Sequence, residues 1–125
     1  AYTLYTTPNE YAKLIIEIMR PGDQNNYSLS DSMLKEMLTH QVRVDTREVI
    51  DRPGRNLGVQ GFRGLGWAID STITGDVFYH SGANKTGFRC YLQFSPKDGS
   101  GIVIMTNGES GSELWQRLIK VIGDF

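Results

Sequence analysis

The sequence has little of several features that would narrow its function at once. It contains one cysteine, Cys90, so neither an internal disulfide nor a cysteine-based metal cluster can form. It has no apolar run of transmembrane length. With 13 basic and 14 acidic residues, its formal net charge is −1, which gives no electrostatic case for binding nucleic acid or an anionic membrane.

No signal peptide opens the chain either. The residues from Ala1 onward are typical of the interior of a protein, so we expect a segment before Ala1, and the missing signal carries no information about the compartment. At 125 residues, 39% of them hydrophobic, the chain is long enough for one domain or part of one.

Helical patterns lie at both ends of the chain. Thr7–Glu10 combines a capping threonine, a proline at the first helical position and a glutamate three residues after the cap, which predicts a helix over residues 7–20. A second apolar stripe predicts a helix over 30–39. A third predicts a helix over 111–123, which Ser110 can cap.

Strand patterns fill residues 65–106. Between Phe88 and Ser95 apolar and polar side chains alternate, which is typical of a half-buried strand. Pro96–Gly99 predicts a tight turn, and Ile102–Met105 is continuously apolar, as expected for a central strand covered on both faces. Residues 40–64 have no clear period and are rich in Gly, Arg and Pro, so we predict mostly loop there.

The order of the elements is two helices, a loop, a run of antiparallel strands and a last helix. This order predicts an α+β fold, with an antiparallel sheet flanked by helices, rather than an alternating α/β fold. The strand that is covered on both faces requires helices on both sides of the sheet.

Two neighbouring tripeptides are candidates for chemistry. Lys85-Thr86-Gly87 matches a signature of the penicillin-recognising serine hydrolases, and His80-Ser81-Gly82 lies just before it. His80 ends a predicted strand, whereas residues 84–87 are typical of a loop. Taken alone, His80-Ser81-Gly82 is also explained by a hydrogen-bonded histidine at a strand end, followed by a turn glycine.

Short motifs occur in a specific order along the chain. They are Leu4–Thr7 leading into Tyr11–Lys13, then Gly64–Trp67, His80–Gly82, Gly87-Phe88 and Met105–Asn107. In this order they resemble the C-terminal part of the β-lactamase-related serine hydrolases, a family of class C β-lactamases, DD-carboxypeptidases and esterases. The resemblance spans nearly the whole chain and implies the C-terminal portion of a penicillin-binding-protein-like, or transpeptidase-like, fold.

The resemblance assigns the third motif of this family to His80-Ser81-Gly82. Relatives have Lys-Thr-Gly or His-x-Gly there, followed by a Gly-Phe pair, which Gly87-Phe88 matches. Lys85-Thr86-Gly87 is then a coincidence of the following turn. The family pattern implies that His80 steadies negative charge in the cleft and that Ser81 hydrogen-bonds a substrate carboxylate or carbonyl.

Three further positions take roles from the resemblance. Gly82 would let the substrate lie against the strand backbone. The backbone N–H of Ala83 would be an oxyanion-hole donor. Asn107 would border the cleft and contact the substrate. Histidine in place of lysine at position 80 favours a peptidase or esterase over a β-lactamase.

The nucleophile of the family is the serine of a Ser-x-x-Lys motif, in which the lysine helps to deprotonate the serine. Ser32 and Lys35 match these letters, but a chain of this length contains the pattern by chance in about one case in two. Ser32 lies in a predicted amphipathic helix that packing explains, and the family places its serine far upstream. Tyr-x-Asn, the second signature, is absent. We therefore expect the nucleophile, its lysine and the tyrosine to precede Ala1.

These inferences predict the C-terminal fragment of a serine hydrolase that acts through an acyl-enzyme on an amide, ester or lactam and is inactive alone. Its partners would be the missing N-terminal part of the same protein and a small-molecule or peptide-like substrate. Exposed sheet or helix faces would favour a homo-oligomer. We expect no cofactor, metal or nucleic acid. The family implies a bacterial parent, in the cell envelope or secreted, with the cytoplasm left open.

Two alternatives remain open. The first is a non-catalytic binding or assembly module that retains the fold, which the missing nucleophile fits equally well. The second is a self-contained site formed by Ser32 and Lys85, which predicts covalent labelling of this chain by a fluorophosphonate or a penicillin; we expect no such labelling.

Four other residues have structural interpretations. His40 ends a predicted helix, where it can interact with free carbonyls. Cys90 falls on the inward face of a strand and is expected to be a small buried hydrophobe. Trp67 and Trp115 are expected to belong to the core rather than to a stacking platform.

Overall fold

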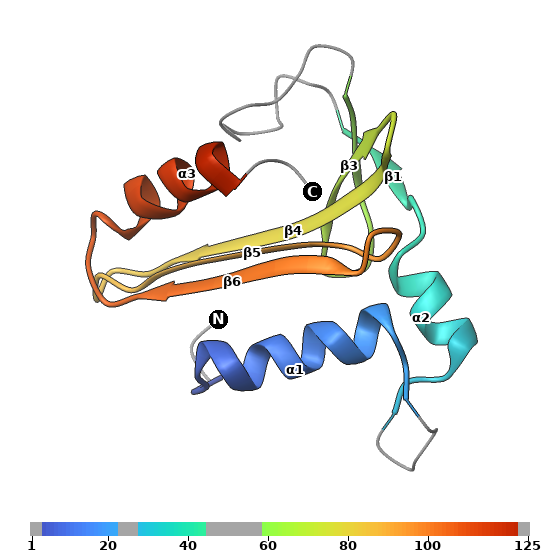
Figure 1. Cartoon of the computed structure of the whole chain (residues 1–125), viewed down its shortest axis with the longest axis horizontal. Coiled ribbons are helices and arrows are strands. Elements are labelled where there is room, and N and C mark those ends of the chain that lie inside the picture. Colours follow the sequence, from blue (N-terminus) through green and yellow to red (C-terminus); the bar gives the residue numbers. More distant parts are fainter. Residues whose placement is uncertain (1–3, 23–27, 45–58, 123–125) are drawn as a thin grey trace.

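Six antiparallel strands form one sheet in chain order, and helices cover both of its faces (Figure 1). The computed structural model describes residues 4–22, 28–44 and 59–122. The strands are β1 (Val42–Arg43), β2 (Gln60–Arg63), β3 (Ala68–Thr72), β4 (Gly75–Ala83), β5 (Arg89–Ser95) and β6 (Ser100–Thr106). The helices are α1 (Pro8–Met19), α2 (Asp31–Met37) and α3 (Gly111–Ile122). The predicted α+β class is confirmed.

The first two helices begin at the capping residues that the sequence indicates. The Thr7 hydroxyl accepts a hydrogen bond from the Glu10 amide at 3.2 Å. The Ser30 hydroxyl does the same for the Met33 amide at 3.3 Å. Each cap satisfies a backbone donor that the first turn of a helix leaves free. No helix in the described ranges is long and apolar enough to cross a membrane.

The main core lies between the sheet and helices α1 and α2. Phe94 is fully buried at its centre, stacked on Phe78 with ring centroids 5.3 Å apart and in edge contact with Trp67 at 5.1 Å. On the opposite face of the sheet, Trp115 of α3 stacks on Tyr91 at 4.2 Å. Trp67 therefore belongs to the core as expected, whereas Trp115 joins α3 to the sheet.

Hydrogen bonds close two of the hairpins, and the second of them is the turn that Pro96–Gly99 predicts. The Thr72 hydroxyl accepts from the Gly75 amide at 3.2 Å and donates to the Gly75 carbonyl at 2.7 Å, which closes the β3–β4 turn. In the β5–β6 turn, the Gly99 amide donates to the Ser95 carbonyl at 2.9 Å. Gly99 has a φ of +66°, a value that glycine adopts without strain.

The prediction of loop over residues 40–64 is wrong where the structure describes this segment. β1 and β2 pair there, with Val42 opposite Arg63 and Arg43 opposite Phe62. The strands escaped prediction because they are two and four residues long and β1 is exposed. Residues 45–58 of the predicted loop lie outside the described part of the chain.

The apolar strand Ile102–Met105 lies in β6, which is at the edge of the sheet and not at its centre. Helices α1 and α3 both contact it, from opposite faces (Figure 1). The prediction of helices on both faces is therefore confirmed. The apolar run reflects this double coverage, which does not require a neighbouring strand on each side.

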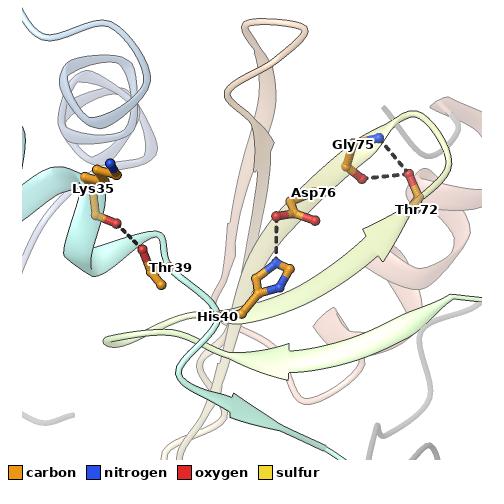
Figure 2. A network of polar contacts seen from close by, with 6 residues as sticks. All are labelled: Lys35, Thr39, His40, Thr72, Gly75 and Asp76. Atoms are coloured by element: carbon orange, nitrogen blue, oxygen red, sulfur yellow. Dashed lines mark hydrogen bonds and ion pairs between the residues drawn. The ribbon is translucent and has the colours of Figure 1, made fainter.

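His40 connects the end of α2 to the start of β4. Its Nε2 lies 2.7 Å from Asp76 Oδ2 (Figure 2), and its ring stacks on Phe62 at 4.0 Å. The expected contact of His40 with the helix carbonyls is wrong, because Thr39 takes that place and donates its hydroxyl to the Lys35 carbonyl at 2.7 Å. His40, at the end of α2, thus contacts both β2, through Phe62, and the β3–β4 hairpin, through Asp76.

We predict that His40→Ala lowers the free energy of unfolding by about 1 kcal/mol, as measured by urea denaturation. The two side chains of the His40–Asp76 pair are 32% and 33% exposed, so solvent screens the pair, and the stacked ring adds a comparably small amount. Asp76→Ala should cost less in the His40→Ala background than in the natural sequence. Equal costs in the two backgrounds would contradict the pairing.

Candidate active site

The triplet His80-Ser81-Gly82 lies on β4, in the part of this strand that extends beyond the end of its neighbour β3. The pairing of β3 with β4 ends at Ala68 opposite Tyr79. The pairing of β4 with β5 continues to Ala83 opposite Arg89. Among the described residues, no strand pairs with 80–83 on the β3 side. The candidate motif therefore lies on a stretch of β4 that is paired on one side, with β5, and open on the other side.

The register determines which backbone groups point to this open edge. In an antiparallel pair, residues alternate between facing their partner strand with both backbone groups and facing away from it. The Asn84 amide donates to the Phe88 carbonyl at 3.3 Å, so this pair is hydrogen-bonded across β4 and β5. Counting back along β4, Gly82 also faces β5, whereas Ser81 and Ala83 direct their N–H and C=O groups to the open side.

The register at β3 supports the same assignment. The Gly64 amide donates to the Trp67 carbonyl at 2.9 Å, so Ala68, one residue further, directs its backbone groups toward β4. Its partner Tyr79 therefore faces β3 and closes the β3–β4 ladder. Ser81 and Ala83 follow Tyr79 at intervals of two residues, which places them on the same side.

A cavity of about 560 Å³ opens beside this edge. Its walls come from β4, from the turn between β2 and β3, and from the first half of α3. They comprise Arg63, Gly64, Gly66, Trp67, Ala68, Tyr79, His80, Ser81, Ser112, Trp115 and Gln116. The cavity thus brings two residues of the triplet together with aromatic and hydroxyl side chains from distant parts of the chain.

The lining of the cavity favours negative charge. Arg63 supplies a guanidinium, His80 borders the cavity from β4, and the lining residues within the described ranges include no carboxylate. His80 and Ser81 are both exposed, and His80 forms no side-chain hydrogen bond within the described ranges. His80 is thus available to a bound group. Across the described residues, no cluster of three metal-ligating side chains occurs.

Lys85-Thr86-Gly87 lies in the β4–β5 turn, as the sequence predicts, and not on a strand. The Asn84 side chain organises this turn, because its Oδ1 accepts from the Thr86 amide at 3.2 Å and from the Phe88 amide at 3.1 Å. Gly87 has a φ of +93°, which disfavours any residue with a Cβ. These contacts give the tripeptide a role in the turn.

Gly82 lies against Cys90, its partner on β5. A Cβ at position 82 would come within 2.6 Å of the Cys90 sulfur, so a side chain there would force this sulfur to move. Cys90 is exposed, which corrects the expectation of a buried side chain; it lies one residue from the start of β5, at the end of the strand. Burial, together with the neighbouring charge of Cys90, raises the pKa of Tyr11.

We predict that Gly82→Ala destabilises the protein by about 1–2 kcal/mol, because the added methyl group overpacks the contact with the Cys90 sulfur. Cys90→Ala removes the sulfur and should recover most of this loss in the double variant. Thermal unfolding of the two single variants and the double variant tests this. Additive losses would show that Cys90 is not the obstacle.

The remaining candidates lie away from the cavity. Asn107 follows β6 and does not line the cavity; its carbonyl lies beside Gly87 in the β4–β5 turn. Ser32 and Lys35 are exposed on α2. Figure 1 shows α2 at the opposite end of the sheet from the turn that carries Lys85. A self-contained site of Ser32 and Lys85 has no support in this arrangement.

Sequence reasoning missed two parts of the cavity wall. Arg63 was overlooked because its strand was predicted as loop. Ser112 and Gln116 lie on α3, whose sequence pattern indicates only the apolar stripe that packs on the sheet. The position of Trp115 beside that stripe was the available signal, since an aromatic residue at the margin of an apolar face can line a neighbouring cavity.

Comparison with known proteins gives one positive result. The family model described as Beta-lactamase matches residues 1–124. Searches of the curated proteins and of the solved structures returned no match.

Proposed function

Because this chain belongs to the Beta-lactamase family, we propose that it forms the oxyanion-binding side of a serine hydrolase active site. The observation that carries the proposal is the open edge of β4, where Ser81 and Ala83 direct their backbone groups away from β5 and beside the cavity. A substrate that lies along this edge would meet hydrogen-bond donors that the sheet does not use.

The reaction would be acyl transfer to a serine. The serine oxygen attacks the carbonyl carbon of an amide, ester or lactam, and the carbonyl oxygen becomes an oxyanion. The Ala83 N–H would donate to this oxyanion, and removal of such a donor typically costs about a hundredfold or more in rate. Collapse of the intermediate expels the protonated leaving group, and water then hydrolyses the acyl-enzyme.

The side chains along the same edge would bind and orient the substrate. The Ser81 hydroxyl would hydrogen-bond a substrate carboxylate or carbonyl, and Gly82 would allow close approach. Arg63 would give the cavity a cationic group, and no carboxylate among the described lining residues neutralises it, which suits an anionic intermediate. His80 would steady negative charge at the same strand edge. Histidine at position 80 favours a peptidase or esterase over a β-lactamase. Asn107 would act only at the margin, since it does not line the cavity.

The nucleophile and its base would come from a part of the protein outside these 125 residues. No lysine lines the cavity within the described part of the chain, and the Ser-x-x-Lys letters at Ser32 and Lys35 fall on α2 at the far end of the sheet. We therefore propose that the chain is catalytically inactive alone and acts together with the remainder of the same protein.

The oxyanion role is tested by Ala83→Pro in the longest natural form of the protein. Proline removes the N–H that faces the open edge but no hydrogen bond between β4 and β5, so we expect kcat/KM for an activated ester to fall about a hundredfold or more. Ala83→Gly keeps the N–H and is the matched control. If both variants behave alike, with folding verified by near-ultraviolet circular dichroism, the assignment fails.

His80→Ala in the same form separates an enzyme from a binding module. We expect this variant to lose hydrolysis while it remains folded, and we expect a fluorophosphonate to label the longest natural form but not the 125-residue chain. Absence of any labelling or hydrolysis in the unmodified long form would favour the non-catalytic module. Labelling of the 125-residue chain would place a nucleophile within it and contradict the proposal.

A further inference from the structure

Three strands place a large, a small and a large side chain in one row beside the cavity. Arg63 of β2 lies directly opposite Ala68 of β3, and Ala68 lies directly opposite Tyr79 of β4. Residues paired in this way have side chains on the same face of the sheet. Neighbouring strands are about 4.8 Å apart, so the Cα atoms of Arg63 and Tyr79 are about 10 Å apart. Only the methyl group of Ala68 lies between their side chains, which leaves a recess above it.

Helix α3 covers the face of the sheet that carries this recess (Figure 1). Tyr91 lies opposite Ser81, and Ser81 shares a face of β4 with Tyr79, because alternate residues of a strand point to the same side. Trp115 of α3 stacks on Tyr91, with ring centroids 4.2 Å apart and ring planes 8° from parallel. The indole of Trp115 therefore stands beside the recess and lines the same cavity as Ala68 and Tyr79.

Both aromatic walls of the cavity are held in place by buried groups. The Tyr79 hydroxyl donates to the carboxylate of Asp70 at 3.5 Å, and Asp70 is buried. Tyr91, on which Trp115 stacks, is also buried and donates its hydroxyl to the Gln93 side chain at 2.9 Å. The two walls are thus fixed in the unliganded protein, so a bound group would not have to order them.

We propose that this cavity binds a flat aromatic group of the substrate. Aromatic rings attract one another more than the area that they bury explains, and Tyr79 and Trp115 supply two such rings. The guanidinium of Arg63, which has no ion pair within the described ranges, can stack on a third. This inference rests on the proposed function, because it names the kind of substrate that the hydrolase would select.

The position of the cavity along the open edge sets where the substrate carries this group. The cavity wall includes Tyr79 and Ser81 but not Ala83, the proposed oxyanion donor. A strand rises about 3.4 Å per residue, so the cavity begins about 7 Å from the donor. The aromatic group would therefore be joined to the reacting carbonyl by a short flexible chain, as in a 4-phenylbutanoyl group.

Binding of 4-phenylbutanamide to the longest natural form of the protein tests the cavity without any need for hydrolysis. When the indole nitrogens are labelled with nitrogen-15, the Trp115 signal is identified by its loss in Trp115→Phe. We expect the ligand to shift this signal with a dissociation constant about threefold to tenfold below that of 4-cyclohexylbutanamide, whose ring is not flat. Equal dissociation constants, or no shift of the Trp115 signal at millimolar ligand, would overturn the proposal.

Variants of the row then locate the ligand. Ala68→Leu fills the recess and should raise the dissociation constant of 4-phenylbutanamide at least about tenfold, whereas Ala68→Ser should keep it within about threefold. Tyr79→Ala should raise it at least about threefold, whereas Tyr79→Phe, which keeps the ring, should not. Thermal unfolding verifies that each variant is folded. Unchanged binding in both Ala68→Leu and Tyr79→Ala would place the ligand elsewhere and overturn the proposal.

Ester hydrolysis by the longest natural form separates this inference from the proposed hydrolase. Two pairs of esters differ only in a phenyl or a cyclohexyl ring, which trifluoroethyl esters carry on the acyl side and acetate esters on the alcohol side. In at least one pair kcat/KM should be about threefold or more higher for phenyl, and Ala68→Leu should remove this preference. Hydrolysis of every ester without preference would overturn the aromatic pocket and leave the hydrolase. Binding of the amide at Trp115 without hydrolysis of any ester would support the pocket and contradict the hydrolase.

Discussion

The unequal lengths of β3 and β4 are the constraint on which the rest of the site depends. β4 has nine residues and β3 has five, and their ladder ends at Tyr79, whereas β5 continues beside β4 to Ala83. The backbone groups of successive residues in a strand point to alternate sides. Of the four residues beyond Tyr79, Ser81 and Ala83 therefore have N–H and C=O groups that pair with neither β3 nor β5. A longer β3 would consume them, and a shorter β5 would leave the strand without support.

Packing on both faces holds this stretch of strand in place. Phe78 and Phe94 anchor β4 and β5 to the core under α1 and α2. On the other face, the stack of Trp115 on Tyr91 fixes the part of α3 that forms a wall of the cavity. The candidate triplet itself contributes little to the core, since His80 and Ser81 are exposed. Stability and candidate function thus lie on different residues of one strand.

Much of this arrangement could be predicted from local sequence. The caps at Thr7 and Ser30, the turn at Pro96–Gly99 and the placement of Lys85–Gly87 in a turn depend on neighbouring residues, and all are found. The prediction that His80–Gly82, and not Lys85–Gly87, is the third motif of the family rests on the order of the motifs along the chain. Neither tripeptide alone distinguishes the two assignments.

The features that escaped prediction depend on residues far apart in the sequence. His40 pairs with Asp76, which lies 36 residues further along the chain, and nothing near His40 indicates this partner. The edge position of β6 follows from strand order, which an apolar run does not specify. The exposure of Cys90 likewise depends on how far other elements cover β5. The alternating pattern indicates only on which face of the sheet its side chain lies.

Amide hydrogen exchange at His80–Ala83 tests the central claim most directly. The account predicts slow exchange at His80 and Gly82, whose amides face β5, and fast exchange at Ser81 and Ala83, whose amides face the open edge. Slow exchange at Ser81 and Ala83 in the 125-residue chain would show that another group already occupies the edge. It would contradict the proposal that these amides are free to bind a substrate.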